Sequence, residues 1–108
     1  MDTILEHIQQ IANVELSQLQ PLTTLLVWTW NSLYEMTVRE GSEVLVQGGS
    51  FFPKPTPACV RGASTTDILA TGWIGVGLSM EFRVEGNRIV TSPVIAIATE
   101  APGISVLQ

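Results

Sequence analysis

Residues 74–84 read Ile74-Gly75-Val76-Gly77-Leu78-Ser79-Met80-Glu81-Phe82-Arg83-Val84, and this stretch decides the fold class. Apolar residues occupy every second position, and glycine or polar residues fill the positions between them. A period of two is typical of a β-strand, because a helix would distribute the same apolar residues around its whole surface. We expect one long strand over residues 73–84, bent at Gly75 and Gly77 so that it serves two faces of a small barrel.

The segment that follows this stretch predicts a hairpin. Residues 85–87 (Glu-Gly-Asn) tolerate the positive φ angles that a tight hairpin turn requires. A return strand is expected at residues 88–91 and a further run at residues 94–99. Pro93 lies between the two runs and indicates an edge position or a bulge, because proline cannot donate a hydrogen bond to a neighbouring strand.

Short β-rich runs separated by glycine and proline also precede the decisive stretch. Strand candidates are residues 25–30, 34–39, 43–47 and 58–61, with turns at residues 31–32 and 40–42. Together with the runs described above, they give about five to seven short strands. That number and spacing favour a small antiparallel β-barrel or sandwich.

The first twenty residues have a different pattern. Apolar residues recur at steps of three and four, which predicts an amphipathic helix from about residue 3 to residue 18. Pro21 would end this helix. The residues that carry the pattern are Ile4, Leu5, Ile8, Ile11, Ala12, Leu16 and Leu19. The expected fold is therefore α+β and mainly β, with an N-terminal amphipathic helix (1–20) followed by a small β-barrel domain (21–108).

Composition restricts the function classes. The chain has 108 residues, of which 45% are hydrophobic and 14% charged, and its formal net charge is −5. One compact domain of this size is ordinary, and an intrinsically disordered chain would be less hydrophobic. The five basic residues are scattered, which argues against binding to nucleic acid. The sequence shows neither a secretory signal nor an apolar run of membrane-spanning length, so we expect a cytoplasmic protein that does not bind membranes.

The sequence offers little for catalysis. His7 is the single histidine and is expected at a solvated surface, and Cys59 is the single cysteine and is expected to be an inert, partly buried thiol. One histidine and one cysteine cannot form a structural zinc site. The glycines of residues 72–77 precede a strand, whereas a phosphate-binding loop needs a helix behind it. We therefore expect no cofactor, no metal and no conventional active site.

Two tryptophans mark a candidate contact surface. Trp28 and Trp30 are two residues apart, so they share one face of a strand. They either fill the core or, if Leu25, Val27 and Thr29 line the core instead, form an exposed apolar stripe. Exposed stripes of this kind usually mark association.

A second aromatic segment precedes three prolines at alternate positions. Phe51 and Phe52 are neighbours, so in extended chain they point to opposite sides. The prolines at positions 53, 55 and 57 favour a stiff crossover strap with few donors for sheet pairing. Either one phenylalanine plugs an end of the barrel, or the segment presents an aromatic anchor to a partner.

These features favour a non-enzymatic interaction or assembly module that forms a homo-oligomer, most simply a two-fold dimer, or that binds another protein. The expected contact residues are Trp28, Trp30, Phe51, Phe52, Arg61, Ile4, Ile8 and Ile11. The alternative function is a small-molecule-binding barrel, with a pocket formed by Trp28, Trp30, Trp73 and Arg61. A further alternative is an enzyme whose active site forms at a subunit interface. The predicted helix would pack either on its own barrel or on another chain.

Overall fold

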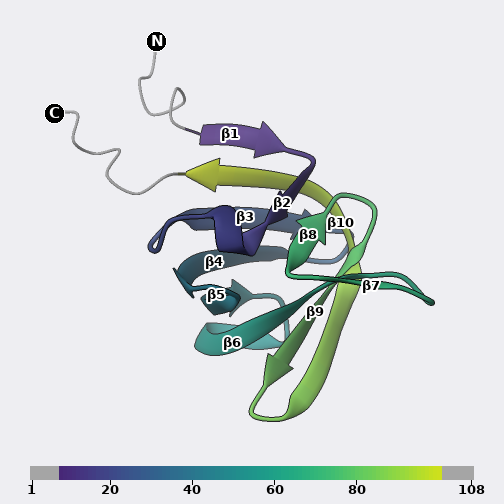
Figure 1. Cartoon of the computed structure of the whole chain (residues 1–108). Coiled ribbons are helices and arrows are strands. Elements are labelled where there is room, and N and C mark those ends of the chain that lie inside the picture. The colour runs from purple at the N-terminus through teal and green to yellow at the C-terminus, as the bar shows by residue number, and fades with distance from the viewer. Residues whose placement is uncertain (1–7, 101–108) are drawn as a thin grey trace, which may run out of the picture.

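Figure 1 shows the computed structural model of the chain, which describes residues 8–100. Within these residues the chain forms ten strands and one short 3-10 helix, η2 (Leu16–Gln18). The strands are β1 (Ile8–Ile11), β2 (Asn13–Glu15), β3 (Thr24–Thr29), β4 (Leu33–Glu40), β5 (Glu43–Gly48), β6 (Phe52–Ser64), β7 (Leu69–Thr71), β8 (Trp73–Gly75), β9 (Ser79–Val84) and β10 (Asn87–Glu100).

Six of these strands form a circuit of antiparallel pairs. β3 pairs with β4, β4 with β5, and β5 with β6. β9 then joins β6 to β10, and β10 returns to β3. In Figure 1, β3 to β6 lie one above the other, and the β9–β10 hairpin extends beside them. The prediction of a mainly antiparallel β fold is confirmed.

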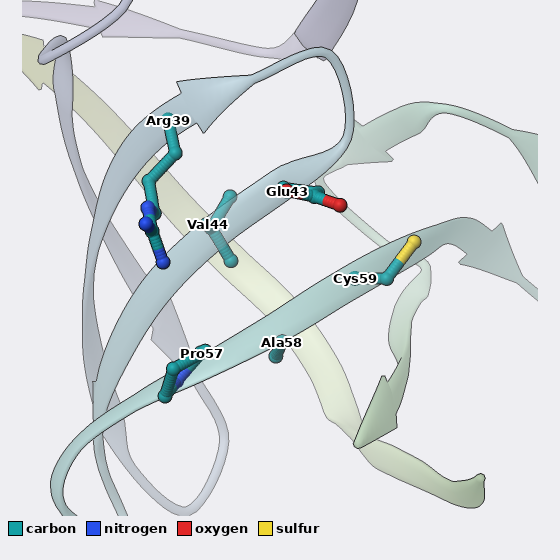
Figure 2. Close-up of a pocket in the computed structure, with 6 residues that line it drawn as sticks. All are labelled: Arg39, Glu43, Val44, Pro57, Ala58 and Cys59. Carbon is teal, nitrogen blue, oxygen red and sulfur yellow. The ribbon is translucent and has the colours of Figure 1, made fainter. Parts of the chain in front are cut away.

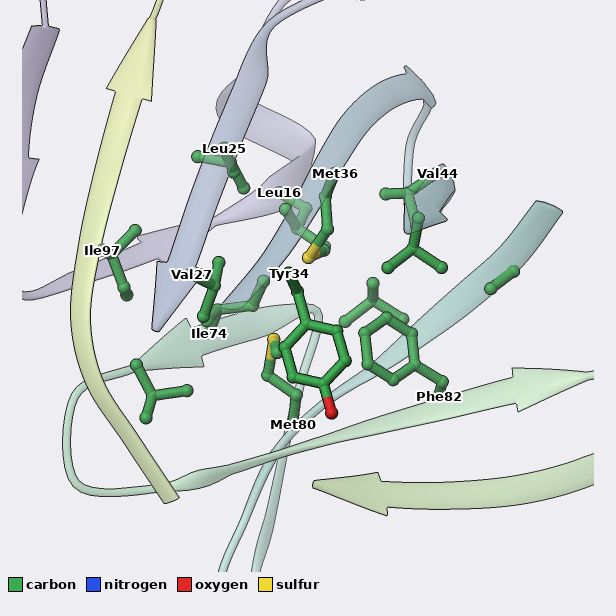
Figure 3. Close-up of a cluster of buried hydrophobic side chains, with 14 of the residues drawn as sticks. Leu16, Leu25, Val27, Tyr34, Met36, Val44, Ile74, Met80, Phe82 and Ile97 are labelled. Atoms are coloured by element: carbon green, nitrogen blue, oxygen red, sulfur yellow. The ribbon is translucent and has the colours of Figure 1, made fainter. Parts of the chain in front are cut away.

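The hydrophobic core lies between the strands of this circuit. Every second side chain of β3, β4 and β5 is buried, so each strand turns one face inward. The Phe52 ring packs edge-on against Tyr34 and Phe82, with ring centroids 6.3 and 5.3 Å away. Figure 3 shows side chains from the strands and from η2 converging on this interior. Fully buried members include Leu16, Leu25, Val27, Met36, Val44, Val46, Ile74, Met80 and Ile97.

The decisive stretch forms two strands, so the expectation of one long bent strand was wrong. β8 and β9 are separated by a turn at residues 76–78. Gly77 adopts a φ of +92° in this turn, a conformation that glycine reaches without strain. The Gly77 amide donates to the Val94 carbonyl, and the Val94 amide donates to the Leu78 carbonyl. The turn is thus held against β10, and the two strands contribute separately to the core.

The hairpin after β9 is confirmed. Glu85 and Gly86 both have positive φ angles, +50° and +85°, as a two-residue turn of the primed type requires. The two expected return runs form one continuous strand, β10. Its pairing register shifts between Val90 and Pro93 and again between Val94 and Ala96. The predicted bulge at Pro93 is therefore present inside a strand that continues beyond it.

The predicted N-terminal helix was wrong within the described residues. β1 pairs with the end of β10, and β2 pairs with β8. The apolar steps of three and four arise because two short strands meet at a bend at Ala12. β-Branched Ile11 and Val14 suit this arrangement, since they lose side-chain freedom in a helix and pack well on a sheet. Residues 3–7, the first part of the predicted helix, lie outside the described residues.

The proline segment is a paired strand, which corrects the expectation of a crossover strap. Residues 52–59 of β6 pair with β5, whereas β9 begins to pair with β6 only at Cys59. Prolines at every second position direct their nitrogens to the same edge of a strand. That edge must be the open one, because a proline nitrogen cannot donate to a ladder. The alternation of the prolines is therefore what allows this segment to join the sheet.

Candidate interaction site

Trp28 lies on the outer face of β3, and Trp30 directly follows the end of this strand. Leu25, Val27 and Thr29 are buried, so Trp28 and Trp30 point away from the core. Trp30 is 74% exposed and Trp28 is partly exposed. Of the two placements left open by the sequence, the structure has the exposed apolar stripe.

Neighbouring strands extend this stripe. Trp28 lies opposite Leu33 of β4 on one side and Ala96 of β10 on the other. Leu33 is exposed, as is Ile95, which occupies the bulge beside Ala96. The Trp30 amide donates to the Pro93 carbonyl, which keeps this end of β3 attached to β10. We call the surface formed by Trp28, Trp30, Leu33, Ile95 and Ala96 the tryptophan face.

The tryptophan face carries no charged side chain. The nearest charged residue in register is Glu35, which lies opposite Leu26, two positions along each strand from Leu33 and Trp28. Sequence reasoning missed Leu33 and Ile95. Leu33 had a signal in its phase, because it is apolar but out of step with the buried residues of β4. An apolar residue out of step with a buried face lies on the opposite face. Ile95 had no such signal, because it is in step with buried Thr91 and Ile97, and only the bulge between Val94 and Ala96 turns it outward.

Phe51 and Phe52 separate as their adjacency predicts. Phe52 is buried in the core, whereas Phe51 is exposed in the turn before β6. The two rings still touch edge-on, with centroids 6.4 Å apart. Phe52 is therefore a core residue, and only Phe51 is accessible to a partner.

The remaining expected contact residues do not gather with the tryptophans. Arg61 lies on β6 and is half-buried, and its carbonyl accepts from the Gly72 amide. Ile11 is half-buried and packs against the core. Ile8 belongs to β1, and Ile4 lies outside the described residues.

Trp73 lines a small apolar hollow of about 180 Å³ with Ala63, Ala70 and Leu78. This hollow includes none of Trp28, Trp30 and Arg61, so it is not the pocket expected from Trp73 together with these residues.

Cys59 lines a shallow hollow between β4, β5 and β6. Its thiol contacts the Val60 carbonyl at 4.0 Å, a weak interaction, and the residue is half-buried. Figure 2 shows the Arg39 side chain and the Cys59 thiol at opposite ends of this hollow.

The outer surface of β9 and of the first half of β10 is polar. The Arg88 guanidinium contacts the Glu81 carboxylate, with Nη2 and Oε1 3.1 Å apart. The Glu81 side chain is 8% exposed and that of Arg88 is 66% exposed, so a buried acid anchors an accessible base. The Thr91 hydroxyl accepts from the Met80 amide and donates to the Ser92 carbonyl, which satisfies the backbone where β10 bulges.

Tyr34 is a buried residue of β4 and follows Leu33 of the tryptophan face. Burial raises the pKa of its phenol above the ordinary value of 10.0, and a hydrogen bond with the Ser32 side chain partly offsets this increase. A buried phenol of this kind remains neutral and serves packing.

Two further observations concern ligands and membranes. Among residues 8–100, no three histidine, cysteine, aspartate or glutamate side chains gather as a metal site. In the same part of the chain, no helix has the length and apolar character needed to cross a membrane.

Comparisons with protein-family models, with curated protein sequences and with solved structures give no match to this chain.

Proposed function

We propose that this protein is a self-associating interaction module, and that a second copy of the chain binds at the tryptophan face. The observation that carries the proposal is the position of Trp30: a largely exposed indole next to Trp28, Leu33 and Ile95 on three adjacent strands. Contiguous exposed apolar surface of this kind is uncommon on soluble monomers and usually marks association. The same proposal takes the strand circuit as a small closed barrel that presents this face.

A second copy suits this surface because of charge. The chain has a net charge of −5, so most of its surfaces would repel another copy. The tryptophan face has no charged member, and two such faces can approach without this repulsion. A two-fold axis through the face makes the contact self-complementary, as in most homodimers. Tryptophan is also among the residues that contribute most binding energy at interfaces.

Sedimentation velocity of the full chain over a range of micromolar concentrations tests this proposal. We expect a dimer that dissociates on dilution. Trp30→Glu should give a monomer at every concentration, because two-fold symmetry brings two added carboxylates into the apolar contact. Trp30 is outside the core, so the variant should remain folded.

Ile68→Glu is the matched control, since Ile68 is 67% exposed and lies in the loop between β6 and β7. It makes the same charge change away from the tryptophan face and should leave the dimer intact. A wild-type monomer throughout would contradict the proposal. So would equal dissociation by both substitutions, or association only with a different protein.

A further inference from the structure

We propose that the hollow between β6, β9 and β10 binds a small molecule through an oxyanion group, a carboxylate or a phosphate. Its polar lining comprises Ser64, Thr65, Thr66, Ser79 and Arg88. This site is separate from the tryptophan face, so its failure would leave the self-association proposal untouched.

Register builds the hollow from distant parts of the chain. Ser64 of β6 lies opposite Ser79 of β9, which in turn lies opposite Pro93 of β10. The register shift between Val90 and Pro93 interrupts regular pairing at this place. The hollow measures about 500 Å³, and three other hollows among the described residues measure about 230, 280 and 180 Å³. This size is within the range of small-molecule sites.

Arg88 supplies prearranged donors. A guanidinium has five N–H donors, and the contact of Nη2 with the Glu81 carboxylate fixes the group at the rim of the hollow. About two-thirds of the Arg88 side chain is exposed, so it is accessible to a ligand. A planar guanidinium held in this way can bind an oxyanion through two parallel hydrogen bonds.

Thr65 adds a hydroxyl whose remaining hydrogen bond must be a donated one. Its hydroxyl oxygen accepts from the amides of Asp67 and Ile68, at 3.3 and 3.2 Å. A hydroxyl has two acceptor sites and one proton. Both acceptor sites are occupied, so the proton of Thr65 is available to a ligand. Together with Arg88, this makes the hollow rich in donors, and the matching ligand group is an acceptor.

The local charge favours an anion although the whole chain is acidic. Arg83 and Arg88 lie directly opposite each other on β9 and β10. Like charges in this position repel, and Glu81 pairs with Arg88 on one side only. The three side chains sum to +1 by count, and the residues that line the hollow include no carboxylate, while exposed Asp67 follows Thr66 in the loop at its edge. Of these three side chains Arg88 lines the hollow, so a bound oxyanion would offset the charge of Arg88.

Amide NMR titration of the full chain with phenyl phosphate, benzoate and neutral glucose tests the site. We expect phenyl phosphate or benzoate to shift the amides of residues 64–66, 79 and 88 with saturation at millimolar concentration. A stronger response to phenyl phosphate identifies a phosphate ligand, and a stronger response to benzoate identifies a carboxylate ligand. Glucose should produce no shift. The proposal is overturned if neither anion shifts these amides, or if glucose alone shifts them.

Three variants assign the binding to Arg88. Arg88→Gln should weaken anion binding about tenfold or more, and Arg88→Lys, which keeps the charge beside Glu81, should weaken it less. Glu81→Gln keeps an acceptor for Arg88 but removes the negative charge, so it should strengthen binding. Arg39→Gln, at the separate hollow near Cys59, is the matched control and should have no effect. Equal losses in Arg39→Gln and Arg88→Gln would show non-specific attraction and would overturn the assignment.

Discussion

The two halves of β10 carry opposite surfaces. The first half, up to Pro93, pairs with β9 and presents Arg88 beside Glu81. The second half, from Val94, pairs with β3 and belongs to the apolar tryptophan face. The inward side does not change in this way, because Ile89, Val94 and Ile97 all pack into or against one core. The inner face is constrained by packing, so the difference between the two halves is confined to the outer face.

The change of surface coincides with the two register shifts of β10. A bulge leaves a residue unpaired and bends its strand, so the outward side chains change direction. Here the shifts lie on either side of Val94, whose amide and carbonyl bond to the turn between β8 and β9. One strand can therefore pair with two different partner strands and carry two different outer surfaces.

We expect the largest loss of stability when one glycine near each of the two surfaces is replaced by alanine. A Cβ at Gly48, near the tryptophan face, would lie 2.1 Å from the Leu33 carbonyl oxygen. One at Gly62, near the polar surface, would lie 2.2 Å from that of Ala70. Gly48→Ala and Gly62→Ala should each lower the free energy of unfolding by about 3 kcal/mol or more in urea titrations, because the clash is with backbone.

Gly41→Ala is the control for these two variants. Gly41 also has a positive φ, +59°, but its Cβ would meet nothing within 4 Å. The expected loss is about 1 kcal/mol, from backbone strain alone. Because both halves share one core, fluorescence and circular dichroism should report the same transition in all three variants. Separate transitions for the two halves would show that they are independent units.

A smaller effect distinguishes the two halves of β10 directly. Thr91→Val removes the hydroxyl that accepts from the buried Met80 amide at 3.0 Å. An unsatisfied buried amide costs about 1–3 kcal/mol, so the urea midpoint should fall. Thr99→Val, the same change in the second half of β10, should leave the midpoint nearly unchanged, since Thr99 lies opposite Leu25 in regular pairing. Equal losses would mean that the bulge hydroxyl has no special role.

The smallest expected effect is the pH dependence from Tyr34. Its pKa in the folded state lies above the ordinary value of 10.0, because burial disfavours the phenolate. The stabilising contribution is therefore complete below pH 10 and is lost as the pH rises through the folded-state pKa. Thermal melts of wild type and Tyr34→Phe should differ in their slope against pH only above about pH 10.

Absorbance titration gives an independent check, because Tyr34 is the only tyrosine in the chain. The folded protein should ionise at higher pH than the protein in denaturant. Ionisation at the same pH in both states would contradict the burial argument.

Sequence reasoning predicted the strands well where a single face alternates, as in β4 and β5. It was wrong at the N-terminus, because steps of three and four also arise from two short strands joined at a bend. The choice depends on partners far along the chain: Ile11 lies opposite Ile97, and Val14 lies opposite Ile74. Such partners override local helix preference and leave no local signal.

For the candidate sites too, local patterns predicted some features, and others depended on distant strands. Period two predicted that Trp28 and Trp30 share a face, but which face points inward depends on β4 and β10. Glycine and proline spacing did not predict the polar hollow, since Ser64, Ser79 and Arg88 meet only through strand register. Sequence patterns therefore predict faces, and register decides which faces meet.

The most direct test of the central claim is a dilution series followed by NMR of the tryptophan indole N–H groups. The chain has three tryptophans, of which Trp28 and Trp30 belong to the tryptophan face and Trp73 lies on β8. Self-association through this face should move the indole signals of Trp28 and Trp30 with concentration and leave that of Trp73 in place. Movement of Trp73 alone, or no movement while the mass of the particle doubles, would contradict the proposed interface.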